Sequence, residues 1–108
     1  MKRGEIWWAE LPPPIGKRPV VLLSRDEAYS VRNAVTAAKV TGTIRNIAVE
    51  VSLGLEDGLP KKCVANLDTI ITIRKESLGE RICLLSAEKI NQLNQALKFA
   101  LYLPSGDC

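Results

Sequence analysis

Basic side chains are concentrated in one stretch of this 108-residue sequence. Between Lys17 and Arg45 there are six lysines and arginines but only two acidic residues, whereas residues 55–108 hold seven of each. A localised excess of positive charge attracts polyanions such as nucleic acid. The net charge is only +3, so a solvated face of a mildly basic protein explains this stretch equally well.

The sequence has no histidine. This excludes histidine-based acid–base catalysis and removes the commonest metal ligand. The three cysteines, Cys63, Cys83 and Cys108, are an odd number and lie far apart, so neither a disulfide framework nor a CxxC zinc site is expected. Cys63 and Cys83 lie in apolar runs typical of buried, unreactive thiols. We therefore predict a protein that uses no metal and no cofactor.

The composition is that of an ordinary soluble domain, with 46% apolar and 25% charged residues. Its longest uncharged apolar runs, such as 19–23, are too short to span a bilayer. Glu5 and Glu10 interrupt any apolar core of a secretory signal. We expect a single domain over residues 1–108 that stays in the cytoplasm and has no membrane partner.

Apolar and β-branched runs predict a mainly β fold. The expected strands are residues 4–11, 18–24, 34–41, 48–53, 62–65 and 70–74. Successive prolines at 12–14 should form a stiff connection, because they cannot donate to a sheet. The continuous apolar run at 18–24 favours a central strand covered on both faces. Residues 25–33 are polar and could form one helical turn or a long connection.

The C-terminal part has helical periodicity. Ser86 is a favourable N-cap, and the spacing in residues 86–103 predicts an amphipathic helix. Its apolar stripe, which we interpret as core packing, consists of Ile90, Leu93, Leu97, Ala100 and Leu101. The Glu-Asp-Gly sequence at 56–58 predicts a turn. Several short strands followed by one helix suggest a small barrel-like sheet packed on that helix.

Four segments resemble toxins of the MazF/PemK family. KRGEIWWAEL resembles the family's opening tetrad before an aromatic strand, and GKRPVVLLS resembles the Gly-x-Arg-Pro-Val segment that begins the second strand. The longest family signature is matched by VTGTIRNIAVEVSLGLEDGLPKKCVANLDTI, and the closing helix by ERICLLSAEKINQLNQAL. Together they cover nearly the whole chain in the expected order.

The resemblance implies a mainly β fold with a C-terminal helix (α+β), an SH3-like barrel of the CcdB/Kid/MazF plasmid-maintenance toxin type. It also implies a cytoplasmic homodimer that cuts single-stranded RNA, mRNA in particular, at selected sequences without a metal. Its partners would be a cognate antitoxin that occupies the active groove and operator DNA that could bind together with the antitoxin.

The family's catalytic arginine and threonine correspond to Arg18 in KRPV and Thr41 in KVTG. A metal-free ribonuclease can use the 2′-hydroxyl of its substrate to attack the adjacent phosphorus, which leaves 2′,3′-cyclic phosphate and 5′-hydroxyl ends. A guanidinium fork can bind two negative phosphoryl oxygens at once, and a threonine hydroxyl can hold a phosphate oxygen or orient the 2′-hydroxyl. We assign Arg18 phosphate binding and transition-state stabilisation, and the general base stays unassigned.

The further candidates for RNA binding are Lys17, Lys39, Thr43 and Arg45. Lys39 takes the place of a proline that is usual in the family, and it is either a phosphate contact or a solvated strand residue. The loop PPPIGK is shorter than the family's usual loop, which closes over the RNA.

Two tryptophans and one polar motif also carry expectations. Trp7 and Trp8 are consecutive on a strand and should point to opposite faces, one into the core and the other to a dimer interface or a stacked base. Asn66 and Asp68 match the family's Asn-Leu-Asp motif, for which we expect a role in stabilising a turn.

Three alternative functions fit parts of the same pattern. A non-catalytic nucleic-acid-binding barrel would need the basic stretch but not Arg18 and Thr41 together. A CcdB-like toxin would bind a protein target through its C-terminal residues, and the sequence PSGDC at 104–108 offers no tryptophan anchor. A family member could also have lost its activity through the short loop. The sequence does not specify which RNA sequence would be cut or which antitoxin would bind.

Overall fold

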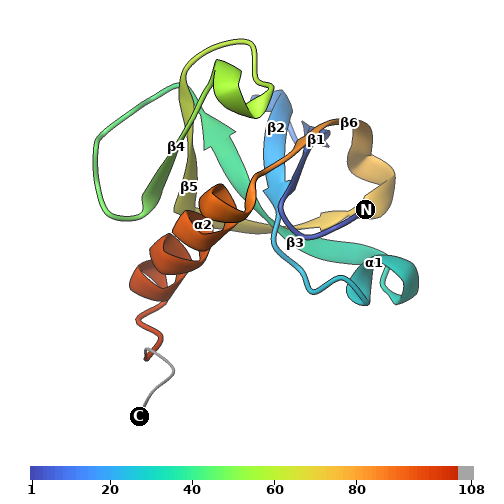
Figure 1. Ribbon diagram of the computed structural model, residues 1–108. Helices are drawn as coiled ribbons and strands as arrows, with labels where there is room; N and C mark the ends of the chain where they lie inside the picture. Colours follow the sequence, from blue (N-terminus) through green and yellow to red (C-terminus); the bar gives the residue numbers. More distant parts are fainter. Residues whose placement is uncertain (105–108) are drawn as a thin grey trace.

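The chain folds around one curled antiparallel sheet, seen in a computed structural model that describes residues 1–104. The strands are β1 (Glu5–Leu11), β2 (Gly16–Leu22), β3 (Ala34–Thr41), β4 (Glu50–Leu53), β5 (Cys63–Arg74) and β6 (Leu78–Leu84). The helices are α1 (Ala28–Val31) and α2 (Ala87–Ala100), with 3-10 turns η1 (Leu55–Asp57) and η2 (Lys75–Ser77). The strand order is β4-β5-β3-β2-β1-β6, with α2 packed against β4 and β5 (Figure 1). The expected mainly β fold with a C-terminal helix is confirmed.

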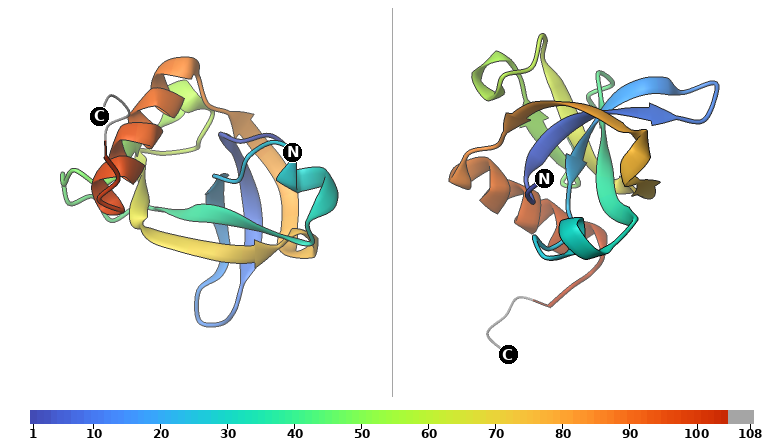
Figure 2. Two further views of the ribbon diagram at one scale, coloured as in Figure 1. Left: turned by 90° about the horizontal axis from the view of Figure 1, so that it is seen from below. Right: turned by 90° about the vertical axis from the view of Figure 1, so that its right-hand side faces the viewer.

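The β2 strand is central, as its continuous apolar run predicts. It pairs with β1 on one side and β3 on the other, and Val20, Val21 and Leu22 are fully buried. Val21 packs in a core cluster that includes Leu93 of α2, whereas Val20 and Leu22 pack in a second cluster that includes Tyr29 of α1. Both faces of the strand are therefore covered. The β1–β2 hairpin projects from this body, as both views in Figure 2 show.

One long strand replaces the two strands expected at 62–65 and 70–74. β5 runs continuously from Cys63 to Arg74. Ala38 pairs with Ile70 but the next residue, Lys39, pairs with Asn66, so β5 bulges by three residues against β3. The side chain of Asn66 accepts a hydrogen bond from the backbone N–H of Asp68 at 2.8 Å inside this bulge. Asn66 therefore stabilises a β-bulge rather than the expected turn, and Asp68 takes part through its backbone N–H. The bulge explains why the sequence pattern looks interrupted.

The C-terminal helix begins as expected and ends earlier. Ser86 Oγ accepts a hydrogen bond from the backbone N–H of Lys89 at 3.2 Å and caps α2. Leu93 and Ala96 form the buried stripe, whereas Leu101 lies beyond the last helical residue and is 52% exposed. The assignment of Leu101 to the core is therefore wrong. No helix within residues 1–104 is both long enough and apolar enough to cross a membrane.

A buried carboxylate joins the N-terminus to the edge strand β6. The Glu5 side chain accepts hydrogen bonds from the backbone N–H of Lys2 at 2.9 Å, from Trp7 Nε1 at 3.0 Å and from Arg81 Nε at 2.8 Å. Glu5 is only 6% exposed. Burial by itself raises the pKa of this carboxyl, but the three hydrogen bonds outweigh burial and hold the pKa below the ordinary value of 4.5.

We expect Glu5→Gln to lower the free energy of unfolding by about 1–3 kcal/mol at neutral pH, because an amide cannot accept all three hydrogen bonds. Since the folded-state pKa is lowered, the charged carboxylate stabilises the fold fully above about pH 4.5, and this contribution is lost as the pH falls through the lowered pKa. Urea unfolding of both proteins at about pH 7 and about pH 3 should show the difference shrinking in acid.

Glu76→Gln is the matched control, because Glu76 pairs with Arg74 at the surface and both side chains are 73% exposed. This change should alter stability by no more than about 0.5 kcal/mol. Equal effects of the two substitutions, or a Glu5→Gln effect that is the same at both pH values, would contradict the role given to Glu5.

Candidate active site

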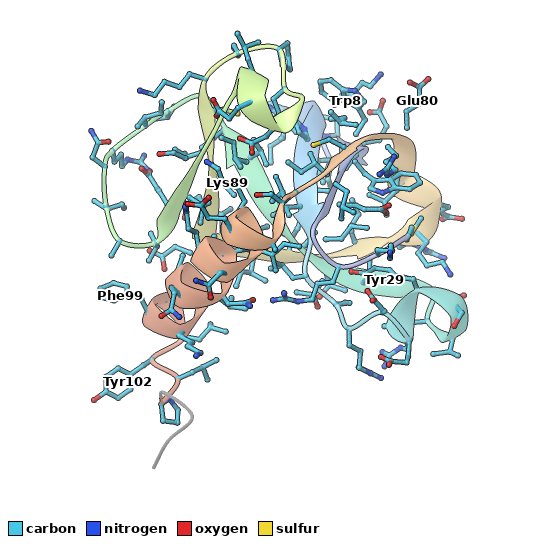
Figure 3. All side chains as sticks on the ribbon, in the orientation of Figure 1. Trp8, Tyr29, Glu80, Lys89, Phe99 and Tyr102 are labelled. Carbon is cyan, nitrogen blue, oxygen red and sulfur yellow. The ribbon has the colours of Figure 1, made fainter. Side chains whose placement is uncertain are left out.

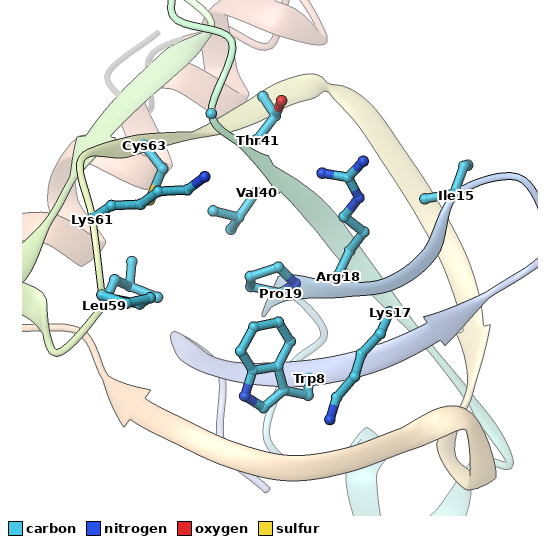
Figure 4. Close-up of a pocket in the computed structure, with 12 residues that line it drawn as sticks. Trp8, Ile15, Lys17, Arg18, Pro19, Val40, Thr41, Leu59, Lys61 and Cys63 are labelled. Carbon is cyan, nitrogen blue, oxygen red and sulfur yellow. The ribbon is translucent and has the colours of Figure 1, made fainter.

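A cavity of about 330 Å³ lies where the start of β2, the end of β3 and the loop before β5 meet. We call it the β2–β3 pocket (Figure 4). Its polar wall residues are Lys17 and Arg18 from β2, Thr41 from the end of β3 and Lys61 from the η1–β5 loop. The remaining lining residues are Trp8, Ile15, Pro19, Val40, Gly42, Leu59, Pro60 and Cys63.

The β2–β3 pocket carries positive charge without a neutralising carboxylate. Three lysine or arginine residues line it, and none of its lining residues is acidic. The ion pairs formed within residues 1–104 join Arg74 to Glu76, Arg81 to Glu5 and Lys89 to Asp57, so they include none of the pocket cations. Such a pocket suits an anion, and a phosphate fits its hydrogen-bond donors.

Strand pairing brings Arg18 and Thr41 together although they are far apart in sequence. Arg18 lies near the start of β2, opposite Ala9 of β1, and Thr41 is the last residue of β3, opposite Val64 of β5. Both residues line the β2–β3 pocket, and Arg18 is exposed. The two residues named by the family pattern thus share one site.

The hydroxyl of Thr41 is oriented by its own loop. Thr41 Oγ1 accepts a hydrogen bond from the backbone N–H of Thr43 at 3.2 Å. A hydroxyl has one proton to donate and two lone pairs, so accepting this bond leaves the proton available. Thr41 can therefore donate to an anion in the pocket. Thr43 contributes here through its backbone.

Lys17 and Trp8 lie together in the wall of the pocket. Lys17 Nζ lies 5.3 Å from the centroid of the Trp8 ring, within the range of a cation–π contact. Figure 4 shows this ammonium turned toward Trp8 and away from the guanidinium of Arg18. Trp7 instead packs on the second core cluster, so the two tryptophans occupy opposite faces as predicted.

Three predicted RNA-binding residues, Lys39, Thr43 and Arg45, are not among the residues that line the β2–β3 pocket. Lys39 lines a neighbouring cavity of about 490 Å³ beside the β1–β2 loop, and Ile15 borders both cavities. Arg45 lies in the β3–β4 loop, where its backbone N–H donates to Glu50 Oε1 at 3.0 Å and its side chain is exposed. RNA contacts by these three residues stay predictions.

Lys61 is a pocket residue that sequence reasoning missed. It precedes β5, and β5 runs antiparallel to β3, so the start of β5 lies beside the end of β3 that carries Thr41. The sequence offered one signal for such a residue, the adjacent lysines Lys61 and Lys62 just before a strand. Whether either lysine reaches the pocket depends on the register between β3 and β5, which the sequence does not show.

The side chains of the β2–β3 pocket can act through positive charge and hydrogen bonds, whereas its thiol is unreactive. Burial raises the pKa of the Cys63 thiol, with Asp57 adding to the effect, so the thiol is protonated at neutral pH and is a weak nucleophile. Cys83 is half-buried and its pKa is also raised by burial, while Cys108 lies outside the described residues. Residues 1–104 bring together no group of three histidine, cysteine or acidic side chains that could hold a metal ion.

Comparison with known proteins shows which family this chain resembles. The model of the PemK-like, MazF-like toxins of type II toxin–antitoxin systems matches residues 2–101. The probable endoribonuclease MazF5 of Mycobacterium tuberculosis is 37% identical over 100 residues, which cover 92% of this chain and 91% of the relative.

Two solved structures share the whole fold. The toxin MazF-mt6 of Mycobacterium tuberculosis superimposes with a TM-score of 0.87 at 32% identity and covers 94% of this chain and 99% of its own. An endoribonuclease from a mycobacterial species, solved with its cognate antitoxin, has a TM-score of 0.87 at 30% identity and covers 97% of this chain and 98% of its own.

Proposed function

The chain belongs to the family of PemK-like, MazF-like toxins of type II toxin–antitoxin systems, and from this membership we propose that the β2–β3 pocket is where it cuts RNA. The protein is an endoribonuclease toxin. Its relatives are named as endoribonucleases, which supports this function over a non-catalytic barrel or a CcdB-like protein-binding toxin. The observation that supports the location is the meeting of Arg18 and Thr41 in one cationic pocket that no acidic residue lines.

The proposed reaction is attack by the RNA on itself. The 2′-hydroxyl gives its proton to a general base, which stays unassigned, and forms a bond to the adjacent phosphorus while the bond from phosphorus to the 5′-oxygen breaks. The products are a 2′,3′-cyclic phosphate and a 5′-hydroxyl, because the departing oxygen takes up a proton. No external water and no metal takes part in the bond exchange.

Arg18 and Thr41 stabilise the transition state of this reaction. Negative charge collects on the phosphoryl oxygens, and the planar fork of Arg18 can donate to two of them at once. Thr41 adds the donor that its hydrogen bond with Thr43 leaves available. A donor already in place at such a charge contributes about 2.7–4 kcal/mol in known enzymes.

Single-stranded RNA is the substrate that the surroundings of the pocket favour. Unpaired bases can stack on aromatic side chains, and Trp8 supplies one in the pocket wall. Lys17 could bind a flanking phosphate once it leaves the ring of Trp8. Lys39 and Arg45 lie farther along the surface and would extend the contact with the RNA backbone.

The proposed partners are a second copy of the chain and a cognate antitoxin. Two aromatic side chains near the end of α2, Phe99 and Tyr102 (Figure 3), are 66% and 96% exposed and are available for a dimer contact. An antitoxin that covers the cationic β2–β3 pocket with acidic residues would block RNA. The complex with its antitoxin would be the form that binds operator DNA, and both would act in the cytoplasm.

Arg18→Lys tests geometry rather than charge, because it keeps the positive charge and removes the fork. We expect single-turnover cleavage of a defined RNA to fall about 10²–10³-fold. RNA affinity should fall far less, because other bases still contact the backbone. Thr41→Val, which keeps the β-branched shape, should also reduce turnover more than affinity.

Arg25→Lys is the matched control, because Arg25 is exposed on the connection after β2 and does not line the pocket. Its cleavage rate should stay within about threefold of the wild type, less than the loss of any transition-state donor. Equally small effects at Arg18 and Arg25 would reduce the basic pocket to a docking surface and would favour the non-catalytic alternative.

A substrate with one 2′-deoxy sugar at the cut site should bind normally and resist cleavage, because its nucleophile is missing. Gel analysis beside the all-ribose oligonucleotide is sufficient. Cleavage of the modified RNA at the normal rate would mean that water attacks instead.

Cleavage should also survive excess EDTA, because the sequence has no histidine and no carboxylates clustered at ligand spacing. The test compares cleavage rates before and after dialysis against the chelator. Complete loss of activity that Mg²⁺ restores would overturn the proposed chemistry.

A further inference from the structure

Lys61 reaches the β2–β3 pocket from the wall opposite Arg18. Figure 4 shows the ammonium of Lys61 and the guanidinium of Arg18 extending from opposite sides toward the end of β3, where Thr41 lies. A Cβ atom built on Gly42 would lie 3.9 Å from Lys61 Nζ, so the ammonium is beside the residue that directly follows Thr41. The two cations thus flank the space in front of the Thr41 hydroxyl.

The backbone around Lys61 is fixed although its side chain is exposed. Leu59 and Cys63, two residues before and two residues after it, are 2% and 6% exposed and pack in the same core cluster. The η1 turn before this segment is closed by Asp57, whose carboxylate accepts a hydrogen bond from the backbone N–H of Gly54 at 3.0 Å. Because both ends are anchored, the loop presents Lys61 at a defined place.

A third contact ties this loop to the helix. Lys89 of α2 donates to the backbone carbonyl of Ser52 and lies 3.8 Å from the carboxylate of Asp57. Figure 3 shows Lys89 on the side of α2 that faces β4 and η1. The carboxylate of Asp57 therefore interacts with Lys89 and Gly54, and the ion pairs within residues 1–104 leave Lys61 without a carboxylate partner.

We propose that Lys61 is a further catalytic residue, which contacts the scissile phosphate from the side opposite Arg18. This assignment rests on the proposed function of the β2–β3 pocket. A phosphate held by Arg18 and Thr41 occupies the space that the Lys61 ammonium faces. Arg18 supplies a directed fork, whereas Lys61 supplies a point charge on a flexible stem, so their contributions differ in kind.

Charge on the reacting phosphate gives Lys61 its effect on rate. The phosphodiester has one negative charge in the ground state and gains more as the 2′-oxygen attacks. A cation on the second wall stabilises the added charge more than the original charge, so it accelerates the step as well as assisting binding. Lys62 does not line the pocket, and its charge should assist RNA docking only.

The test compares Lys61→Met with Lys62→Met at two adjacent exposed positions. Each substitution removes one positive charge and keeps nearly the shape of the side chain. Single-turnover rates at saturating RNA should fall about 10²-fold for Lys61→Met and less than about threefold for Lys62→Met. Lys61→Arg keeps the charge and should recover a large part of the loss. Unchanged melting temperatures would show that the variants are folded.

The outcomes separate this assignment from the proposed function. If the wild type cuts RNA, Arg18→Lys is impaired and Lys61→Met has a normal saturated rate with weaker binding only, Lys61 is a docking residue and the assignment is wrong. If Lys61→Met and Lys62→Met have equal effects, the assignment is wrong as well. A wild-type protein that cuts no RNA would contradict the proposed function and this assignment together.

Discussion

Antiparallel pairing on both sides of β3 is the constraint on which the site depends. The pairing of Val20 with Lys39 sets the start of β2 beside the end of β3, and the pairing of Thr41 with Val64 sets the start of β5 beside the same end. Three segments that are far apart in the chain therefore meet where the neighbouring strands β2, β3 and β5 begin or end. A shift of either register by one residue would turn the pocket side chains to the opposite face.

The distribution of acidic residues keeps this meeting place positively charged. Glu5, Glu50 and Asp57 all accept hydrogen bonds from backbone N–H groups of turns or loops, and none of them lines the β2–β3 pocket. The pocket cations repel one another, but they are exposed and solvent screens the repulsion, so its cost to folding is small. A phosphate that enters the pocket relieves this repulsion. The same carboxylates that fix the loops thus leave the site selective for anions.

Sequence patterns predicted the elements whose own composition defines them. The apolar and β-branched runs of β2, β3 and β4 and the helical stripe of α2 were visible in single segments, and the family resemblance supplied Arg18 and Thr41. β6 was missed because this edge strand is largely exposed and carries little apolar alternation. Lys61 was missed, and Lys39 was left between two roles, because their places depend on the bulged register between β3 and β5, which no local pattern specifies.

The chemistry of the RNA ends tests the central claim most directly, because it reports which oxygen attacked the phosphorus. Mass spectrometry of the fragments of a short oligoribonucleotide, cut by the purified protein, identifies both new ends in one experiment. We expect a 2′,3′-cyclic phosphate on the upstream fragment and a 5′-hydroxyl on the downstream fragment. A 3′-hydroxyl with a 5′-phosphate would show that water attacks the phosphorus, and it would contradict the reaction assigned to the β2–β3 pocket.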